Sequence, residues 1–196
     1  LAWVHRYMGD AENAEREFRV VYDAYRELHG LENMNTLGAG HALAILLGQG
    51  GREAESIEVY DQIVAGCGVL REECGFRWGL YLFERGKIQL RIEDYEAATA
   101  SLRDGHAACV EVWGHEDWRT SQVEFEVGVA LAGMGDTGGA DHLVEAYQRL
   151  YDSERVSPDA KADYYARLEL SLNSLDAGNR LEDVPDFIDF DNYGTV

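Results

Sequence analysis

The sequence predicts an all-α protein, a solenoid of stacked antiparallel helix pairs. Two observations carry this prediction: no strand pattern interrupts the helical patterns, and small residues recur every 42 positions. Each small residue has a large apolar residue four positions later and a second small residue twelve positions earlier. The small residues are Ala14, Ser56, Ala98 and Ala140, the large ones Phe18, Tyr60, Leu102 and Val144, and the earlier small ones Ala2, Ala44, Gly86 and Gly128. Helices that oppose small and large residues interlock closely, and units that bury their apolar faces only against neighbours form a solenoid.

The turns between helix pairs repeat as well. Gly30-Leu31-Glu32-Asn33-Met34-Asn35-Thr36 and Gly114-His115-Glu116-Asp117-Trp118-Arg119-Thr120 place Gly, Glu and Thr at the same spacing. With the helix segments Leu43-Ala44-Ile45-Leu46-Leu47 and Gly51-Arg52-Glu53-Ala54-Glu55, this pattern resembles the tetratricopeptide repeats (TPR) of kinesin light chains and their bacterial and fungal relatives. The resemblance covers about residues 1–176. It implies a right-handed superhelical solenoid of about four repeats, with a C-terminal capping helix and a tail. The sequence departs from the family at Ser56, where Ala is usual, and in the third unit, where Glu72-Glu73-Cys74-Gly75 replaces the Gly-x-Glu turn.

Turn residues set the expected helix limits. Asp10, Asp94 and Asp136 offer side-chain oxygens to helix starts, and Pro158 suits a first helical position. We expect helices near residues 1–8, 11–29, 34–49, 52–67, 72–91, 94–112, 117–134, 138–154 and 158–176. They form a TPR-like repeat domain over residues 1–176, with repeats near 1–29, 34–67, 72–112 and 117–154 and a last helix at 158–176, followed by a tail at 177–196. Leu1 falls inside a first-repeat helix, so we expect the solenoid to continue upstream in a longer parent protein.

Acidic residues dominate the charge: 37 Asp and Glu stand against 17 Lys and Arg, a formal net charge of −20. Nucleic acids and anionic membranes both select cationic surfaces, so we expect neither as a partner. The three cysteines, Cys67, Cys74 and Cys109, show no zinc-ligand spacing. Their odd number predicts reduced thiols in a cytoplasmic protein, with a Cys67–Cys74 bridge as the alternative.

No pattern indicates catalysis. The glycine clusters at 48–51 and 133–135 lack the preceding strand and the following Lys of a phosphate loop, so we predict turns there. His106 and Cys109 share a helical face, but nothing completes a four-ligand zinc site. No Ser, Cys or Lys has a nucleophile motif around it. We therefore expect a protein that is not an enzyme and that uses no metal or cofactor.

TPR families bind peptides or helices along the concave face, which the first helix of each pair lines, so the resemblance implies a set of binding residues. Aligned on the repeat, they are Trp3, Arg6, Tyr7, His41, Ile45, Gln49, Leu80, Phe83, Lys87, Arg91, Gln122, Phe125, Val129, Tyr164 and Arg167. The set holds four cations, five aromatic residues and no acid. Aromatic and Arg side chains are typical anchors of binding hot spots, so the set predicts an acidic, aromatic peptide ligand. Packing between neighbouring helices is the competing use for the same side chains.

Two functions fit these observations. The first is a protein- or peptide-binding module that acts as a scaffold or adaptor within a larger protein. The alternative is a ligand-sensing regulatory domain of a signalling or transcriptional regulator, and a third is a structural spacer or oligomerisation surface. The tail from Glu182 to Val196 has five acids, no base and interleaved Phe187, Ile188 and Phe190. We expect it to cap the last helix pair or to dock in the groove, in the same molecule or, by self-association, in a neighbour.

Overall fold

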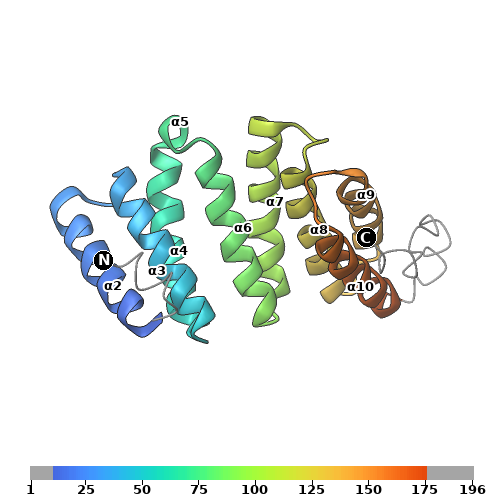
Figure 1. Cartoon of the computed structure of the whole chain (residues 1–196), viewed down its shortest axis with the longest axis horizontal. Coiled ribbons are helices and arrows are strands. Elements are labelled where there is room, and N and C mark those ends of the chain that lie inside the picture. The colour runs from blue at the N-terminus through green and yellow to red at the C-terminus, as the bar shows by residue number, and fades with distance from the viewer. Residues whose placement is uncertain (1–10, 176–196) are drawn as a thin grey trace, which may run out of the picture. The chain divides into compact units, whose positions relative to one another are not determined.

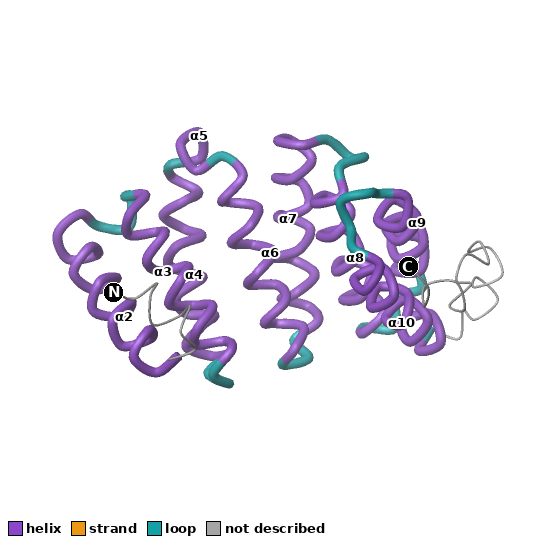
Figure 2. Tube along the Cα trace, in the orientation of Figure 1, coloured by secondary structure: helices purple, strands orange, loops and turns teal. Residues whose placement is uncertain are grey.

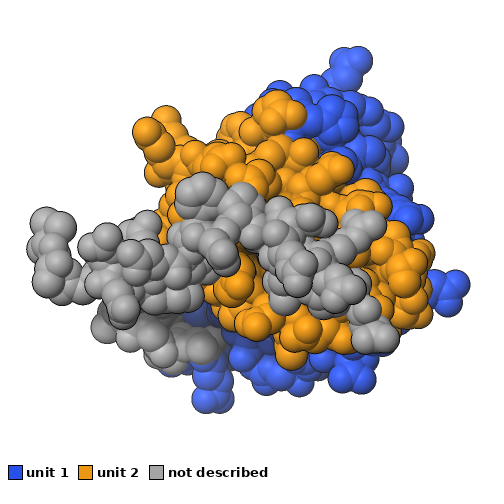
Figure 3. Space-filling model, turned by 90° about the vertical axis from the view of Figure 1, so that its right-hand side faces the viewer, with its two compact units in different colours: residues 1–115 blue, residues 116–196 orange. Residues whose placement is uncertain are grey.

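The computed structural model describes residues 11–175, and every regular element within that range is an α-helix (Figures 1 and 2). The chain divides into two compact units, residues 1–115 and 116–196, which Figure 3 colours separately. The first unit holds α2 (Ala11–His29), α3 (Met34–Gln49), α4 (Glu53–Val69), α5 (Arg71–Cys74), α6 (Phe76–Arg91) and α7 (Tyr95–Trp113). The second holds α8 (Trp118–Gly133), α9 (Gly139–Asp152) and α10 (Pro158–Ser174). The predicted all-α class is confirmed, and the predicted helix at 1–8 and the tail lie outside the described residues.

Helices of the first unit interlock through small residues. A Cβ added to Gly86 of α6 would lie 2.6 Å from Cγ of Leu102 of α7, so only a glycine lets the leucine pack this closely. Towards the other end of the pair, Gly79 would place a Cβ 3.1 Å from Cys109 Sγ. Contacts thus run backwards along α7 as they run forwards along α6, which makes the pair antiparallel. The predicted small-against-large packing is confirmed, and Ala98 near the start of α7 is 0% exposed.

Ser56 shows why the second repeat tolerates a serine where the family usually has alanine. The residue is fully buried between α3 and α4. Its hydroxyl donates a hydrogen bond of 2.6 Å to the carbonyl oxygen of Ala44. A buried hydroxyl without such a partner would cost about 1–3 kcal/mol. Because the Ser56 hydroxyl is hydrogen-bonded, serine can replace the usual alanine at this closely packed position.

The repeated turns combine a left-handed glycine with a capping side chain. Gly30 and Gly114 have φ values of 75° and 83°, which glycine adopts without steric cost. Asn33 then accepts hydrogen bonds from the amides of Asn35 and Thr36, and Asp117 accepts one from the amide of Arg119. These bonds satisfy free N–H groups at the starts of α3 and α8. At later helix starts, the predicted cap Asp94 is confirmed by a bond from the amide of Ala97, and Ser157 accepts one from the amide of Ala160. The predicted cap Asp136 is wrong: it accepts from the amide of Gly138, the residue before α9, and no side chain caps α9.

The turn that opens the third repeat, at residues 70–75 (the third turn), contradicts two predictions. The expected single helix over 72–91 is wrong: the chain forms the four-residue α5 and then breaks at Gly75, whose φ of 51° favours glycine. The expected reduced thiols are wrong for two of the three cysteines. Cys67 and Cys74 form a disulfide with a Cα–Cα distance of 5.7 Å, because the break places the end of α5 beside the last turns of α4. The Cys109 thiol is buried and takes no part in a disulfide.

The second unit repeats the interlock with a shift of one residue. A Cβ on Gly128 would lie 2.6 Å from Cγ of Leu143, and Leu143 is fully buried, whereas the predicted Val144 is half-buried. The shift arises because Gly139 also lacks a side chain. A Cβ added to Gly139 would lie 2.9 Å from the carbonyl oxygen of Gly128, so α8 and α9 approach closely one position before Ala140. Ala140 is buried as predicted.

α10 ends the described part of the second unit. Leu168 and Leu172 are fully buried against the core that α8 and α9 form. Leu170 stands where the earlier first helices have Gly86 and Gly128, yet it is 74% exposed. Among the described residues, no second helix therefore packs on this face of α10, as expected of a terminal helix.

Candidate peptide-binding surface

Two helices carry the predicted binding residues of the first unit. Residues four apart on a helix share one face, and the repeat gives α3 and α6 equivalent sets at this spacing. The sets are His41, Ile45 and Gln49 on α3, and Phe83, Lys87 and Arg91 on α6. Trp3, Arg6 and Tyr7 lie outside the described residues.

Arg91 connects α6 to the end of α3. Its Nη2 donates a hydrogen bond of 3.0 Å to the carbonyl oxygen of Gly48. A Cβ on Gly48 would lie only 3.0 Å from the same nitrogen, so the missing side chain makes room for the guanidinium. Glu53 of α4 lies 3.8 Å away, and half of the Arg91 side chain is exposed. This ion pair is long and open to solvent, so Arg91 keeps donors that a ligand can reach.

Lys87 lies one helical turn before Arg91. Its Nζ stands 5.0 Å from the centre of the Phe83 ring, a favourable position for a cation over an aromatic face. Glu84, three residues earlier on α6, accepts from the same Nζ at 3.3 Å. The Lys87 side chain is 43% exposed, and Phe83 is half-buried. A cation and a partly open aromatic ring thus stand side by side on α6.

His41 belongs to the packing between helices. Its ring centre lies 4.9 Å from that of Tyr81 on α6, and its Nδ1 lies 3.3 Å from the hydroxyl of Tyr60 on α4. Burial raises the pKa of the Tyr81 hydroxyl. Ile45 is half-buried and Gln49 is exposed on the same face. Among the three predicted residues of α3, Ile45 and Gln49 are therefore the better placed to meet a ligand.

In the second unit, α8 and α10 bring together the four predicted residues Gln122, Phe125, Tyr164 and Arg167. Gln122 Nε2 donates a hydrogen bond of 2.9 Å to the Tyr164 hydroxyl. Phe125 is 0% exposed, and the Tyr164 ring stands edge-to-face on it with centres 5.0 Å apart. The pKa of Tyr164 is raised, first by burial and then by the nearby charge of Glu126. Phe125 therefore supports this surface from below, while Gln122 and Tyr164 are half-buried at it.

Arg167 is committed to an internal acid. It donates to both carboxylate oxygens of Glu126, at 2.8 and 2.6 Å, and its guanidinium lies 5.3 Å from the centre of the Phe125 ring. The Glu126 side chain is only 6% exposed. Burial alone would lower the pKa of Arg167, but the hydrogen bonds to Glu126 and the charges of Glu126 and Asp163 together raise it. Paired bonds of this kind are among the strong ones in proteins, so Arg167 holds α10 on α8.

Three solved structures have a similar fold over nearly the whole chain. No family model and no curated protein matches the sequence. Nearly identical TPR-like repeats of a protein from Podosopora anserina, named as a kinesin light chain, have a TM-score of 0.73 at 16% identity, covering 94% of this chain and 90% of that chain. A single-substitution variant of the same repeats has a TM-score of 0.74 at 18% identity, covering 94% and 89%. BtubC (BKLC) from P. vanneervenii has a TM-score of 0.74 at 17% identity, covering 95% of this chain and 74% of that chain.

This chain has the TPR-like repeat fold. The likeness concerns the fold, and it agrees with the repeat register that the sequence predicts. In that register α3, α6, α8 and α10 are the first helices of their TPR-like pairs, and they carry all the predicted binding residues that the structure describes. Leu80 and Val129 lie on α6 and α8, half-buried against the two cores.

The charges around the predicted binding residues differ from what those residues alone suggest. The set contains no acid, yet each of its three described cations has an acidic neighbour: Glu84 for Lys87, Glu53 for Arg91 and Glu126 for Arg167. The pairs are unequal. The Lys87 side chain, 43% exposed, meets Glu84 at 3.3 Å, and the Arg91 side chain, 50% exposed, lies 3.8 Å from Glu53, whereas Arg167 makes short, paired bonds to the buried Glu126. Only Lys87 and Arg91 therefore remain available to a ligand carboxylate.

Other kinds of site find no support in the described residues. Within residues 11–175, no three His, Cys, Asp or Glu side chains are grouped to hold a metal ion. In the same range no helix combines the length and the apolar character needed to cross a membrane.

Proposed function

We propose that the chain is a protein-interaction module that binds an extended peptide on α3 and α6, and that the peptide carries an acidic residue next to an aromatic one. The observation that carries this proposal is the group of Phe83, Lys87 and Arg91 on one face of α6. It combines a partly open aromatic ring with two cations whose internal partners are weak. Exposed ion pairs contribute about 0–1 kcal/mol, so a ligand carboxylate can exchange with Glu84 or Glu53 at little cost.

The apolar part of the ligand has a place beside these cations. Ile45 of α3 and Phe83 of α6 lie on equivalent faces of the two first helices, one helical turn apart in the repeat register, and both are half-buried. An aromatic side chain laid on them would remove apolar surface from water, which is the main source of binding free energy. In the second unit, Tyr164 and Gln122 offer a separate aromatic and hydrogen-bonding surface for the same class of ligand. We further propose that the module serves as a scaffold or adaptor in the cytoplasm.

A charge-reversal experiment tests the ligand class. The probe is an array of short peptides in which acidic, basic, aromatic and aliphatic residues are varied independently at each position. The wild-type chain should prefer peptides with an acid next to an aromatic residue. The double variant Lys87→Glu/Arg91→Glu should lose that preference and select basic residues instead, while it keeps the aromatic preference.

A matched control separates this effect from overall charge. Arg16→Glu/Arg103→Glu reverses the same number of charges at exposed positions on α2 and α7, which are second helices. It should bind like the wild type. Identical peptide preferences in the two double variants would refute the assignment, and so would the absence of any acidic or aromatic preference in the wild type.

A further inference from the structure

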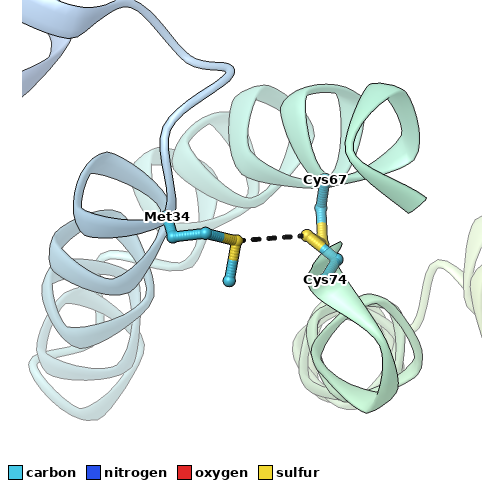
Figure 4. The surroundings of a disulfide bond; sticks show 3 residues. All are labelled: Met34, Cys67 and Cys74. Atoms are coloured by element: carbon cyan, nitrogen blue, oxygen red, sulfur yellow. Dashed lines mark hydrogen bonds between the residues drawn. A yellow bond between two sulfur atoms is a disulfide. The ribbon is translucent and has the colours of Figure 1, made fainter. Parts of the chain in front are cut away.

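The third turn is held by a disulfide, whereas the equivalent turns before α3 and α8 are held by capping side chains. Cys67 belongs to α4 and Cys74 to α5, and the two side chains are 0% and 1% exposed. The Cys74 sulfur also lies 3.9 Å from the Met34 sulfur at the start of α3 (Figure 4). One covalent bond therefore joins α4 to α5 directly against the first residue of α3.

Turn chemistry is otherwise weak at this place. α3 and α8 begin with Asn33 and Asp117, whose side chains accept hydrogen bonds from the helix amides. α6 begins after Gly75, which has no side chain to offer. Cys74 stands where the repeated turns have Glu32 and Glu116. The disulfide thus stands at the position of the missing turn motif and, in its place, fixes the chain before α6.

The short helix α5 depends on that bond. Four residues form barely one turn, and such a helix is not stable by itself in water. Its closing backbone bonds are two, from the amide of Cys74 to Leu70 and from the amide of Gly75 to Arg71. The residues on both sides of Cys74 are exposed.

α5 in turn connects its neighbours. The Arg71 guanidinium lies 4.5 Å from the centre of the Trp78 ring on α6. The same group donates to both carboxylate oxygens of Glu111 on α7, at 3.2 Å. If α5 loses its fold, these contacts to α6 and α7 are lost with it.

We propose that Cys67 and Cys74 form a redox-sensing pair whose reduction releases the segment from Leu70 to Trp78. Disulfides in reducing compartments are usually transient or redox-sensing, whereas stable ones belong to oxidising compartments, so this inference rests on the cytoplasmic location proposed above. The proposal stands apart from peptide binding, because it concerns the order of this turn.

The chemistry is a thiol–disulfide exchange with a dithiol reductant. One thiolate of the dithiol attacks a sulfur of the Cys67–Cys74 bond, which breaks and leaves a mixed disulfide and one cysteine thiolate. The second thiol of the reductant then attacks the mixed disulfide. The cysteines end as two thiols and the reductant as a disulfide, so two electrons and two protons pass to the protein. Because both sulfurs are buried, α5 must open before the attack, and the rate of reduction reports that opening.

The test compares the oxidised and reduced wild-type chain under native conditions, with dithiothreitol as the reductant. Alkylation and mass spectrometry count the free thiols, and hydrogen exchange and limited trypsin digestion report the order of the turn. We expect dithiothreitol to free both cysteines without unfolding α3 or α4. The rate of amide exchange over residues 70–78 should rise by at least about tenfold. Without the disulfide the turn can open locally, and local opening costs less free energy than global unfolding. Trypsin should cut faster after Arg71 and Arg77.

Variants separate the pair from the third cysteine. Cys67→Ser/Cys74→Ser should behave like the reduced chain with or without dithiothreitol, and Cys109→Ser should behave like the wild type. Two results would overturn the proposal. One is a bond that dithiothreitol reduces only when the whole chain unfolds, which marks a structural disulfide. The other is equal exchange and equal cleavage of the turn in the two redox states.

Discussion

Two glycines on first helices, Gly38 of α3 and Gly86 of α6, should respond differently to substitution by alanine. Alanine stabilises a helix interior by about 1 kcal/mol relative to glycine. Gly38 of α3 has no atom within 4 Å of an added Cβ, so Gly38→Ala should gain that amount. At Gly86 of α6 the added Cβ would lie 2.6 Å from Cγ and 2.8 Å from Cδ2 of Leu102. Overpacking of this kind costs about 1–3 kcal/mol, so Gly86→Ala should be neutral to destabilising.

The difference between the two variants isolates the steric cost, because the helix-propensity gain is common to both. We expect Gly38→Ala to exceed Gly86→Ala in free energy of unfolding by about 1–3 kcal/mol. Gly128→Ala should be worse than Gly86→Ala. Its Cβ would meet two backbone atoms, Leu143 N at 3.0 Å and Gly139 O at 3.1 Å, which cannot rotate away as a side chain does.

The assay is urea unfolding followed by far-ultraviolet circular dichroism, with a double-mutant cycle as the internal check. Leu102→Ala leaves a cavity and should cost about 2–5 kcal/mol alone. In that background Gly86→Ala no longer meets Leu102, so it should become stabilising by about 1 kcal/mol. A change of sign between the two backgrounds measures the contact directly. The packing argument fails if Gly86→Ala stabilises the wild type as much as Gly38→Ala does.

Two further predictions concern charge and protonation in the second unit. Arg167→Met should lower the free energy of unfolding, measured in urea, by about 3–5 kcal/mol, because it leaves the buried Glu126 carboxylate unpaired. Adding Glu126→Gln should recover most of this loss. A single variant as stable as the wild type would contradict the pairing. Burial, then the neighbouring Tyr151, raises the pKa of Tyr147 to about 12 from 10.0. The folded state therefore holds a proton that the unfolded state releases, and the free energy of unfolding should fall as the pH rises from 10 to 12. Tyr147→Phe should remove that part of the fall, and equal slopes for the variant and the wild type would count against this burial.

The repeat could be read from the sequence because its signals are local. Small residues at a fixed interval, such as Ala14 and Ala98, need no knowledge of the rest of the chain to be recognised. The one-residue shift at Leu143 could not be read in the same way. It depends on the close approach of Gly128 and Gly139, two glycines on different helices whose meeting only the packed structure shows.

The third turn escaped prediction for a related reason. The run Glu72-Glu73-Cys74 favours a helix, and helical spacing continues through the following residues, so nothing local marks the break. The left-handed conformation of Gly75 decides it, and that conformation in turn decides whether Cys74 can reach Cys67. Two cysteines seven residues apart are compatible with a bridge or with free thiols until the backbone between them is known.

The acidic partners of the candidate surface were partly readable. Glu84 and Lys87 are three residues apart on one helix, a spacing that brings side chains together. Glu126 and Arg167 are separated by 41 residues, one less than the repeat, so they fall on neighbouring first helices. The period that revealed the fold could therefore have predicted this pair. The Glu53–Arg91 contact had no such signal, since it joins the start of a second helix to the end of a first one.

These acids change what the surface selects. A ligand carboxylate that reaches Lys87 or Arg91 replaces Glu84 or Glu53, so the Coulomb gain is the difference between two similar pairs. Each exposed pair contributes about 0.2–1 kcal/mol, and their difference is smaller still. An aromatic ring over Phe83 and Ile45 gains about 25 cal/mol for every Å² of apolar surface removed from water. The aromatic residue therefore supplies most of the affinity and the carboxylate selects among aromatic ligands, which is why charge reversal should redirect the preference of this surface rather than abolish binding.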